Sequence, residues 1–208
     1  MNDKCLTTME ALSMVILFMV GDYLVLPLGG DCYLGRDHAR VLAAIITIPV
    51  MLIYSYILNK YPDKNLYEIF QIVFGKYIGN FIVLTYIFYL INLWALIIRN
   101  TSNFIITLTL YDTPVYVFII GLTILNIMAI PKGLKVISNV SKLFLMITIL
   151  FLTFVTIASI PNMSSEEFIT LSQNMNFNLI GKGVFSLVSF PFTELVVFLL
   201  IFTRMKCK

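Results

Sequence analysis

Charged residues are scarce in this chain. Aspartate, glutamate, lysine and arginine make up 12% of its 208 residues, whereas soluble domains carry about 25%. Hydrophobic residues make up 60%, and the mean hydropathy is +0.95. A chain with so few charges cannot cover itself with a water-soluble surface. We therefore expect an integral membrane protein, with the lipid bilayer as its surroundings.

Side chains that carry common catalytic chemistry are also few. The single histidine, His38, excludes a multi-histidine metal centre, and the three cysteines, Cys5, Cys32 and Cys207, lack the spacing of a metal site or a disulfide framework. No phosphate loop, G-x-S-x-G or H-E-x-x-H motif occurs. We therefore expect no enzymatic activity, no cofactor, no bound metal and no nucleic-acid partner.

The chain has long apolar segments instead. Six of them are long enough, or nearly so, to cross a hydrocarbon core of about 30 Å as helices. Short connections join them, which predicts an all-α membrane protein with a single transmembrane domain over residues 1–208. The predicted spans are 11–28, 41–58, 78–98, 115–130, 143–160 and 184–203.

Lysine and arginine are distributed unevenly between the two sides of these spans. If the N-terminus lies in the cytoplasm, ten of the 14 basic residues fall on inner segments. The other four, Arg36, Arg40, Arg99 and Lys182, fall on outer segments or at the ends of spans. Cytoplasmic loops of membrane proteins are enriched in positive residues. Both termini are therefore predicted to be cytoplasmic.

Two of the polar connections carry signals for the start of a helix. Asn65 and Glu68 have the spacing of a capping box, and residues 66–75 have one apolar face, which predicts a short helix at the inner membrane surface. Ser164 and Glu167 have the same spacing within the longest connection, 161–182, and predict another short helix.

A proline and an acid interrupt the sixth apolar segment, in the run Ser189-Phe190-Pro191-Phe192-Thr193-Glu194. Pro191 cannot donate a backbone N–H, so the helix is predicted to kink or break there. Glu194 would lie near the membrane midplane, where an ionisable group costs on the order of 2.5–3.5 kcal/mol. We expect it to serve a ligand, proton or water pathway. The alternative is a neutral or hydrogen-bonded acid that serves packing alone.

The first apolar segment ends with a similar run, Gly21-Asp22-Tyr23-Leu24-Val25-Leu26-Pro27-Leu28-Gly29-Gly30. Paired interrupted helices indicate a transporter site. Freed N–H groups can bind a carboxylate and freed carbonyls an ammonium, so an amino acid suits such a site. Alternatively, Pro27 and the glycines simply end the first helix at the outer surface.

Tyr89 in the third span is a further ligand contact or a packing residue.

The two interrupted runs and several shorter motifs occur in the order found in a known family. By these motifs the chain resembles the B-subunit family of bacterial spore germinant receptors, the GerB-type spore germination permeases of the amino acid–polyamine–organocation superfamily. The resemblance covers nearly the whole chain, and the Phe-Pro-Phe-x-Glu stretch is its most specific part. The remaining motifs are Tyr61-Pro62-Asp63-Lys64-Asn65-Leu66, Phe74-Gly75-Lys76, Thr113-Pro114, Lys132-Gly133, Val136-Ile137 and Ile160-Pro161-Asn162.

The resemblance implies a LeuT-like fold of two inverted five-helix repeats, whose first and sixth helices are discontinuous around a central site. It also implies a subunit of the spore inner membrane that senses a small nutrient, often an amino acid, together with an A subunit and a lipoprotein C subunit. Asp22 departs from the small or hydroxyl residue expected there, which leaves the ligand open. By position, the ligand-binding residues implied are Gly21, Asp22, Pro27, Phe190, Pro191, Phe192 and Glu194.

Members of this family have about ten spans, whereas this chain has six. We therefore expect an incomplete form, truncated after the sixth helix, from a frameshifted, split or incompletely predicted gene. The leading hypothesis is a nutrient-sensing subunit that triggers spore germination. Two alternatives stay open: an active amino-acid or cation transporter that uses Glu194 as proton carrier, and a non-functional or regulatory fragment.

Overall fold

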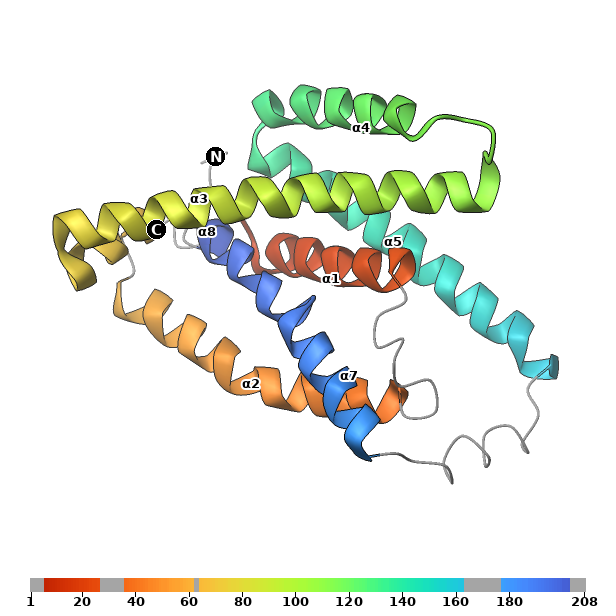
Figure 1. Ribbon diagram of the computed structural model, residues 1–208, viewed down its shortest axis with the longest axis horizontal. Helices are drawn as coiled ribbons and strands as arrows, with labels where there is room; N and C mark the ends of the chain where they lie inside the picture. Colours follow the sequence, from red (N-terminus) through yellow and green to blue (C-terminus); the bar gives the residue numbers. More distant parts are fainter. Residues whose placement is uncertain (1–5, 27–35, 62–63, 163–176, 203–208) are drawn as a thin grey trace. The chain divides into compact units, whose positions relative to one another are not determined.

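The computed structural model describes residues 6–26, 36–61, 64–162 and 177–202, and every regular element in these ranges is a helix (Figure 1). Six helices there are long and apolar enough to cross a bilayer, which confirms the prediction of an all-helical chain with six such helices. The elements are α1 (Thr8–Val25), α2 (Arg36–Lys60), α3 (Leu66–Thr109), α4 (Val115–Ala129), η2 (Ile130–Lys132), α5 (Leu134–Ser159), η3 (Ile160–Asn162), α7 (Phe177–Ser189), η4 (Phe192–Phe198) and α8 (Leu199–Phe202).

Several helices are longer than the apolar segments that predicted them. Helix α3 continues past Arg99, which we expected to end the third span, and α5 begins at Leu134. Helix α7 begins at Phe177, inside the connection predicted over 161–182. Hydrophobicity predicts only the apolar centre of a helix, whereas backbone hydrogen bonding continues through polar turns at its ends. The short helix predicted at Ser164 and Glu167 lies outside the described residues.

Capping boxes set the starts of two helices. The backbone N–H of Asn65 donates to Oε2 of Glu68 over 3.0 Å at the start of α3, which confirms the capping box predicted there. Thr7 and Glu10 form the same reciprocal pair at the start of α1, with N···O distances of 2.9 and 3.4 Å. Each pair satisfies backbone N–H groups that the first helical turn leaves without partners.

Gly75 divides α3 into a short first arm and a long second arm. Its φ of 76° and ψ of 169° suit glycine and interrupt the helix. The two arms approach most closely at Gly79, where an added Cβ would lie 2.9 Å from the Cα atom of Gln71. The Gln71 amide donates to Tyr67 on the same arm and to Asn80 across the approach, over 2.6 and 2.8 Å. The short helix predicted over 66–75 is therefore the first arm of α3.

The described helices contribute to two compact units, which interleave along the chain. The first comprises Met1–Ala11, Leu58–Asn139 and Val197–Lys208, and in it α4 runs alongside α3 (Figure 1). The second comprises Leu12–Ile57 and Val140–Val196. Its buried core joins α2 to α7 through Ala39, Ala43, Ile180 and Leu187, with Tyr23 of α1 and Phe192 of η4 packed against it.

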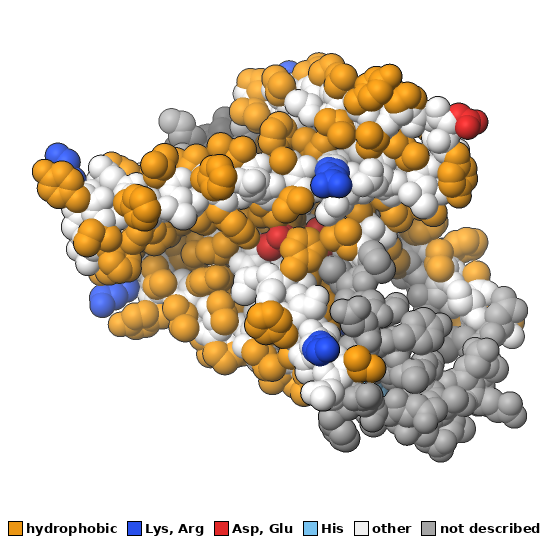
Figure 2. Space-filling view, in the orientation of Figure 1, with side chains coloured by type: hydrophobic (Ala, Val, Ile, Leu, Met, Phe, Trp, Pro, Cys, Tyr) orange, Lys and Arg blue, Asp and Glu red, His pale blue; other side chains and the backbone are white. Residues whose placement is uncertain are grey.

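Most apolar side chains point outward. Figure 2 shows hydrophobic atoms over most of the visible surface, with only scattered charged groups between them. Helix α4 buries no residue, and α5 buries only Ser138. Apolar helix faces of this kind are suited to contact with lipid tails or with other helices in a bilayer.

Candidate functional site

The last apolar segment changes its helical form at Pro191. Helix α7 ends at Ser189, and the seven-residue 3-10 helix η4 follows from Phe192. Pro191 has no N–H to donate to the carbonyl of Leu187, four residues earlier, so the α-helical pattern cannot continue through it. The N–H of Glu194 instead donates to the carbonyl of Pro191 over 3.0 Å. The Thr193 hydroxyl donates to the carbonyl of Ser189. A 3-10 run of this length is uncommon and often marks a functional hinge.

Two carboxylates of the second unit are buried. Asp22, on α1, is 8% exposed, and Glu194, on η4, is 5% exposed. The Asp22 Oδ2 and Glu194 Oε2 atoms have no hydrogen-bond partner among the described residues. Both acids lie in the same compact unit. Buried polar groups in proteins almost always have partners, so these two oxygens are an exception that suggests a function.

Tight packing holds the elements that carry these acids. Ala39 and Ala43 on α2 are fully buried against α7, where small side chains allow helices to approach closely. Tyr23 follows Asp22 on α1 and packs against this core, and the guanidinium of Arg40 lies 5.6 Å from the centre of its ring. The backbone positions of Asp22 and Glu194 are therefore set by a small apolar core rather than by polar contacts of their own.

Four of the residues implied as ligand-binding are buried or packed on the core of the second unit. Asp22, Pro191 and Glu194 are buried, and Phe192 packs against the core that joins α2 to α7. Gly21 lies inside the regular helix α1 with open space beside it.

The other predicted residues lie elsewhere. The break predicted over Gly21–Gly30 is not seen at Gly21 or Asp22, which lie inside α1, and Pro27 with the rest of that stretch from residue 27 on is outside the described residues. Phe190 is half-buried in the turn before η4. Tyr89 belongs to the first unit, on α3, where its ring stacks on that of Tyr86 with centroids 6.3 Å apart.

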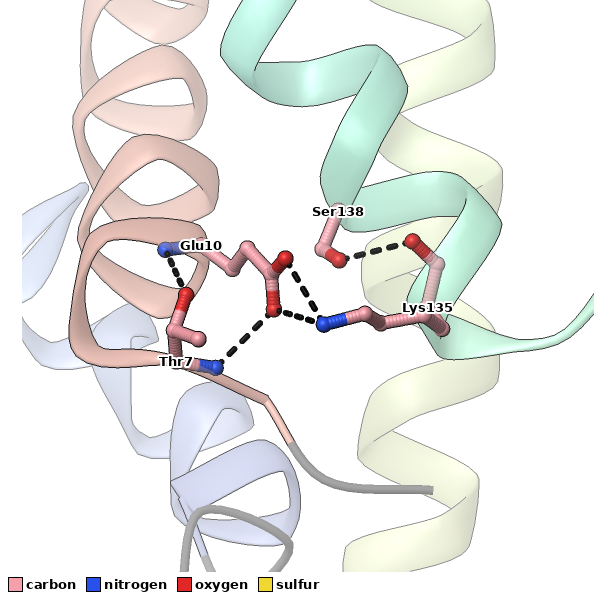
Figure 3. Close-up of polar contacts among 4 residues, drawn as sticks. All are labelled: Thr7, Glu10, Lys135 and Ser138. Atoms are coloured by element: carbon pink, nitrogen blue, oxygen red, sulfur yellow. Dashed lines mark hydrogen bonds and ion pairs between the residues drawn. The ribbon is translucent and has the colours of Figure 1, made fainter. Parts of the chain in front are cut away.

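The first unit contains an ion pair that sequence reasoning did not predict. Both carboxylate oxygens of Glu10, at the start of α1, lie 2.8 Å from Nζ of Lys135, in the first turn of α5 (Figure 3). Glu10 is 3% exposed, and the Lys135 side chain is 35% exposed. The Ser138 hydroxyl, one turn along α5, donates to the carbonyl of Lys135 over 2.9 Å. The pair joins the starts of two helices that are far apart in sequence.

The sequence alone gives a local signal for Glu10 but none that pairs it with Lys135. The Thr7-x-x-Glu10 spacing is that of a capping box and could have placed the start of α1. Lys135 lies 125 residues away, in a basic stretch whose charge alone indicates membrane orientation. Only the fold shows that the two side chains meet.

The arrangement of Asp22 and Glu194 limits the chemistry available. Ionised carboxylates accept hydrogen bonds and cannot donate them. Among the described residues, no third acidic, cysteine or histidine side chain joins them in a group that could hold a metal ion. Two such acids can bind a positively charged group, or take up and release a proton. Neither role requires a covalent step.

Comparison with known protein families matches the chain over residues 5–208 to the family described as spore germination protein. Spore germination protein KB of Bacillus subtilis (strain 168) is 26% identical over 132 residues, which cover 62% of this chain and 35% of that protein. Spore germination protein YndE of the same strain is 25% identical over 118 residues, which cover 57% and 32%. The aligned parts thus span about a third of these relatives. No solved structure is significantly similar.

The family match is far longer than either pairwise alignment. It includes both buried carboxylates, the proline between α7 and η4, and both partners of the Glu10–Lys135 pair. Because it extends over nearly all of the chain, the chain belongs to the spore germination protein family, the GerB-type spore permeases.

Proposed function

We propose that this protein is the membrane subunit of a spore germinant receptor, which senses a small nutrient, such as an amino acid, and triggers germination without enzymatic chemistry. The observation that carries this proposal is the pair of buried carboxylates of Asp22 and Glu194, each with one oxygen that lacks a hydrogen-bond partner among the described residues, in a chain of the spore germination family. Ionisable groups inside a membrane protein are costly and usually mark a ligand or ion pathway.

The proposed mechanism is a shift between two conformations. In a LeuT-like arrangement, helices 1 and 6 are discontinuous and enclose the ligand; α1 and the α7–η4 segment correspond to them here. The change to 3-10 geometry at η4 supports a hinge at this point. A nutrient that binds one conformation more tightly than the other shifts the population toward it. The shift would then pass to the A and C subunits.

We further propose that the subunit lies in the spore inner membrane with both termini in the cytoplasm. The distribution of lysine and arginine supports this orientation. The Glu10–Lys135 ion pair is consistent with it, because the pair requires the starts of α1 and α5 to lie on one side of the membrane. With five spans in alternation, the first and the fifth start on the same side.

Germination of spores tests the proposed function. The gene is deleted from a spore-forming host and restored as wild type, as Glu194→Gln, or as Asp112→Asn, which removes an exposed acid. We expect the deletion and Glu194→Gln to abolish germination on at least one nutrient, measured by the fall in optical density of the spore suspension. Asp112→Asn should respond like wild type. Equal germination with and without the gene, on every nutrient tried, would refute the proposal.

A proton-coupled transporter is the second candidate. The observation that favours it is Glu194 itself, a buried acid beside the change from α7 to η4, with one oxygen that has no partner in the described ranges. Such a group can carry a proton during transport. The distinguishing measurement is uptake of labelled amino acids into vesicles. Accumulation that requires a pH gradient and is lost in Glu194→Gln supports transport, whereas the sensing proposal predicts binding without accumulation.

A further inference from the structure

We infer that the outward face of α3 around Asn92, Arg99 and Asn103 is a helix interface, and that its partner is a transmembrane helix with a carboxylate opposite Arg99. The inference concerns assembly in the membrane and does not depend on the proposed function. It starts from Arg99, because the sequence predicts this cation at the end of a span, whereas the structure continues α3 as far as Thr109.

The first step is the depth of Arg99 in the membrane. Helix α4 and η2 together form a candidate span, Val115–Lys132, which is about 27 Å long and so just able to cross the hydrocarbon core. Helix α4 runs alongside the later part of α3 (Figure 1). Arg99 lies about 15 Å before the end of α3, which makes it level with α4. The cation therefore lies within the hydrocarbon depth, where charged side chains are almost always paired.

The second step is that the described part of the chain provides no such pairing. The side chain of Arg99 is exposed, and no ion pair or side-chain hydrogen bond joins it to another group in the described ranges. Lys135, in contrast, meets the carboxylate of Glu10. A guanidinium stays charged, because it cannot be neutralised by losing its proton in a protein. The charge of Arg99 is therefore left for a group outside these ranges to compensate.

The third step is that Arg99 belongs to a stripe of polar side chains along α3. Asn92, Arg99 and Asn103 are all exposed, and their positions lie within about 40° of one another around the helix axis. Between residues 81 and 99, only Asn92 carries an amide and only Arg99 a charge. The Asn92 amide donates one N–H to the carbonyl of Phe88 over 2.8 Å, which leaves its other N–H and its oxygen available. Side-chain amides of this kind form hydrogen bonds between membrane helices.

The fourth step identifies the partner by its charge. A carboxylate accepts two parallel N–H bonds from a guanidinium, which compensates the cation with favourable geometry. A second copy of the chain is unfavourable, because copies in one membrane share one orientation, and a symmetric contact along this stripe would place Arg99 against Arg99. Lipid tails supply neither a charge nor a hydrogen bond. The stripe thus fits a different helix, with an acid facing Arg99 and a polar group facing Asn92.

Transmembrane peptides of defined sequence test the inference on the full chain. The chain is reconstituted at pH 8 in vesicles of phosphatidylcholine, a lipid without net charge. Two leucine-rich peptides are compared, one with a central glutamate and the other with a glutamine at the same position. Each carries a dansyl label, which accepts energy from Trp94, the single tryptophan of the chain, on α3. The fall of Trp94 emission as peptide is added therefore measures association.

Variants of the stripe are measured beside two matched controls. Arg99→Gln and Asn92→Leu each remove one polar group of the stripe. Lys76→Gln removes an exposed cation elsewhere on α3. Asn126→Leu removes an exposed amide on α4 that donates to the carbonyl four residues earlier, as Asn92 does. Circular dichroism on each variant checks that the helices are intact.

We expect the glutamate peptide to bind the wild type and both controls equally, and at least about tenfold more tightly than the glutamine peptide does. Arg99→Gln should remove this preference, and Asn92→Leu should weaken binding about threefold. Equal binding of the two peptides, no binding of either, or a preference that persists in Arg99→Gln would overturn the inference. Dimerisation of the peptide-free chain that Asn92→Leu abolishes would also overturn it, because the occupant of the stripe would then be a second copy.

Discussion

Breaking the Glu10–Lys135 ion pair should destabilise the protein, and more so when the lysine is removed than when the glutamate is. Lys135→Met leaves Glu10 as a buried carboxylate without its cation, since Glu10 is 3% exposed. Removing one partner of a buried ion pair costs about 3–5 kcal/mol. Glu10→Gln leaves the charge on Lys135, whose side chain is 35% exposed and can turn to water. We therefore expect a smaller loss, about 1–3 kcal/mol.

The glutamine variant also separates the ion pair from the capping box. Glutamine can accept the hydrogen bond from the backbone N–H of Thr7, as the present carboxylate does. The stability change of Glu10→Gln therefore measures the loss of the charge, because the hydrogen bond at the start of α1 is kept. Thr7→Ala provides the matched control, because it removes the reciprocal bond to the N–H of Glu10 and leaves the ion pair in place. That change should cost about 1 kcal/mol.

The assay is a double-mutant cycle on the free energy of unfolding in mixed micelles, followed by circular dichroism as denaturing detergent is added. Glu10→Gln combined with Lys135→Met should cost less than the sum of the single changes, by about 1–3 kcal/mol. Additive losses, or a larger loss from Glu10→Gln than from Lys135→Met, would refute the reasoning. Either result would mean that the two groups do not compensate each other's charge in a buried setting.

Three further predictions follow from the same structure. Glu194→Gln should raise the free energy of unfolding of the ligand-free chain, by about 1–2 kcal/mol in the same micelle assay, because it removes a buried ionisable acid with an oxygen that lacks a partner among the described residues; a loss as large as that of Glu10→Gln would contradict this. Gly79→Ala should lower the free energy of unfolding by about 1–3 kcal/mol, because the added Cβ clashes with the other arm of α3. Gly121→Ala, in open space on α4, should be neutral or slightly stabilising. Equal effects of the two changes would disprove the close approach. A membrane-impermeant maleimide added outside protoplasts should label Cys32 but neither of the other two cysteines; labelling of Cys5 and Cys207 without Cys32 would reverse the proposed orientation.

The contrast between two kinds of buried acid separates stability from function in this protein. Glu10 and Glu194 are about equally buried, but Glu10 meets Lys135, whereas one oxygen of Glu194 has no partner in the described part of the chain. A buried charge with its cation in place holds two helices together. A buried acid that lacks such a partner among the described residues is unfavourable for folding, so the ligand-free protein should gain stability when that acid is replaced by glutamine.

Local features of the fold could be predicted well from sequence. Long apolar segments predicted the six helices, and the Asn65–Glu68 spacing predicted the start of α3, because these signals depend on neighbours in the chain. Helix ends were predicted less well, as at Arg99, where polar turns continue the helix beyond its apolar centre. Proline and glutamate in one apolar run were enough to single out Glu194, because both are unfavourable there.

By itself the sequence determined the membrane class, the helical content and the two acids most worth attention, because composition and local spacing report burial and hydrogen bonding along the chain. The tertiary structure decided which acids are buried and which of them meets a basic partner. It buried Asp22 and Glu194 in one compact unit and brought Lys135 to Glu10 across 125 residues. Electrostatic energy depends on distance in space and on burial, and neither can be read from distance along the chain.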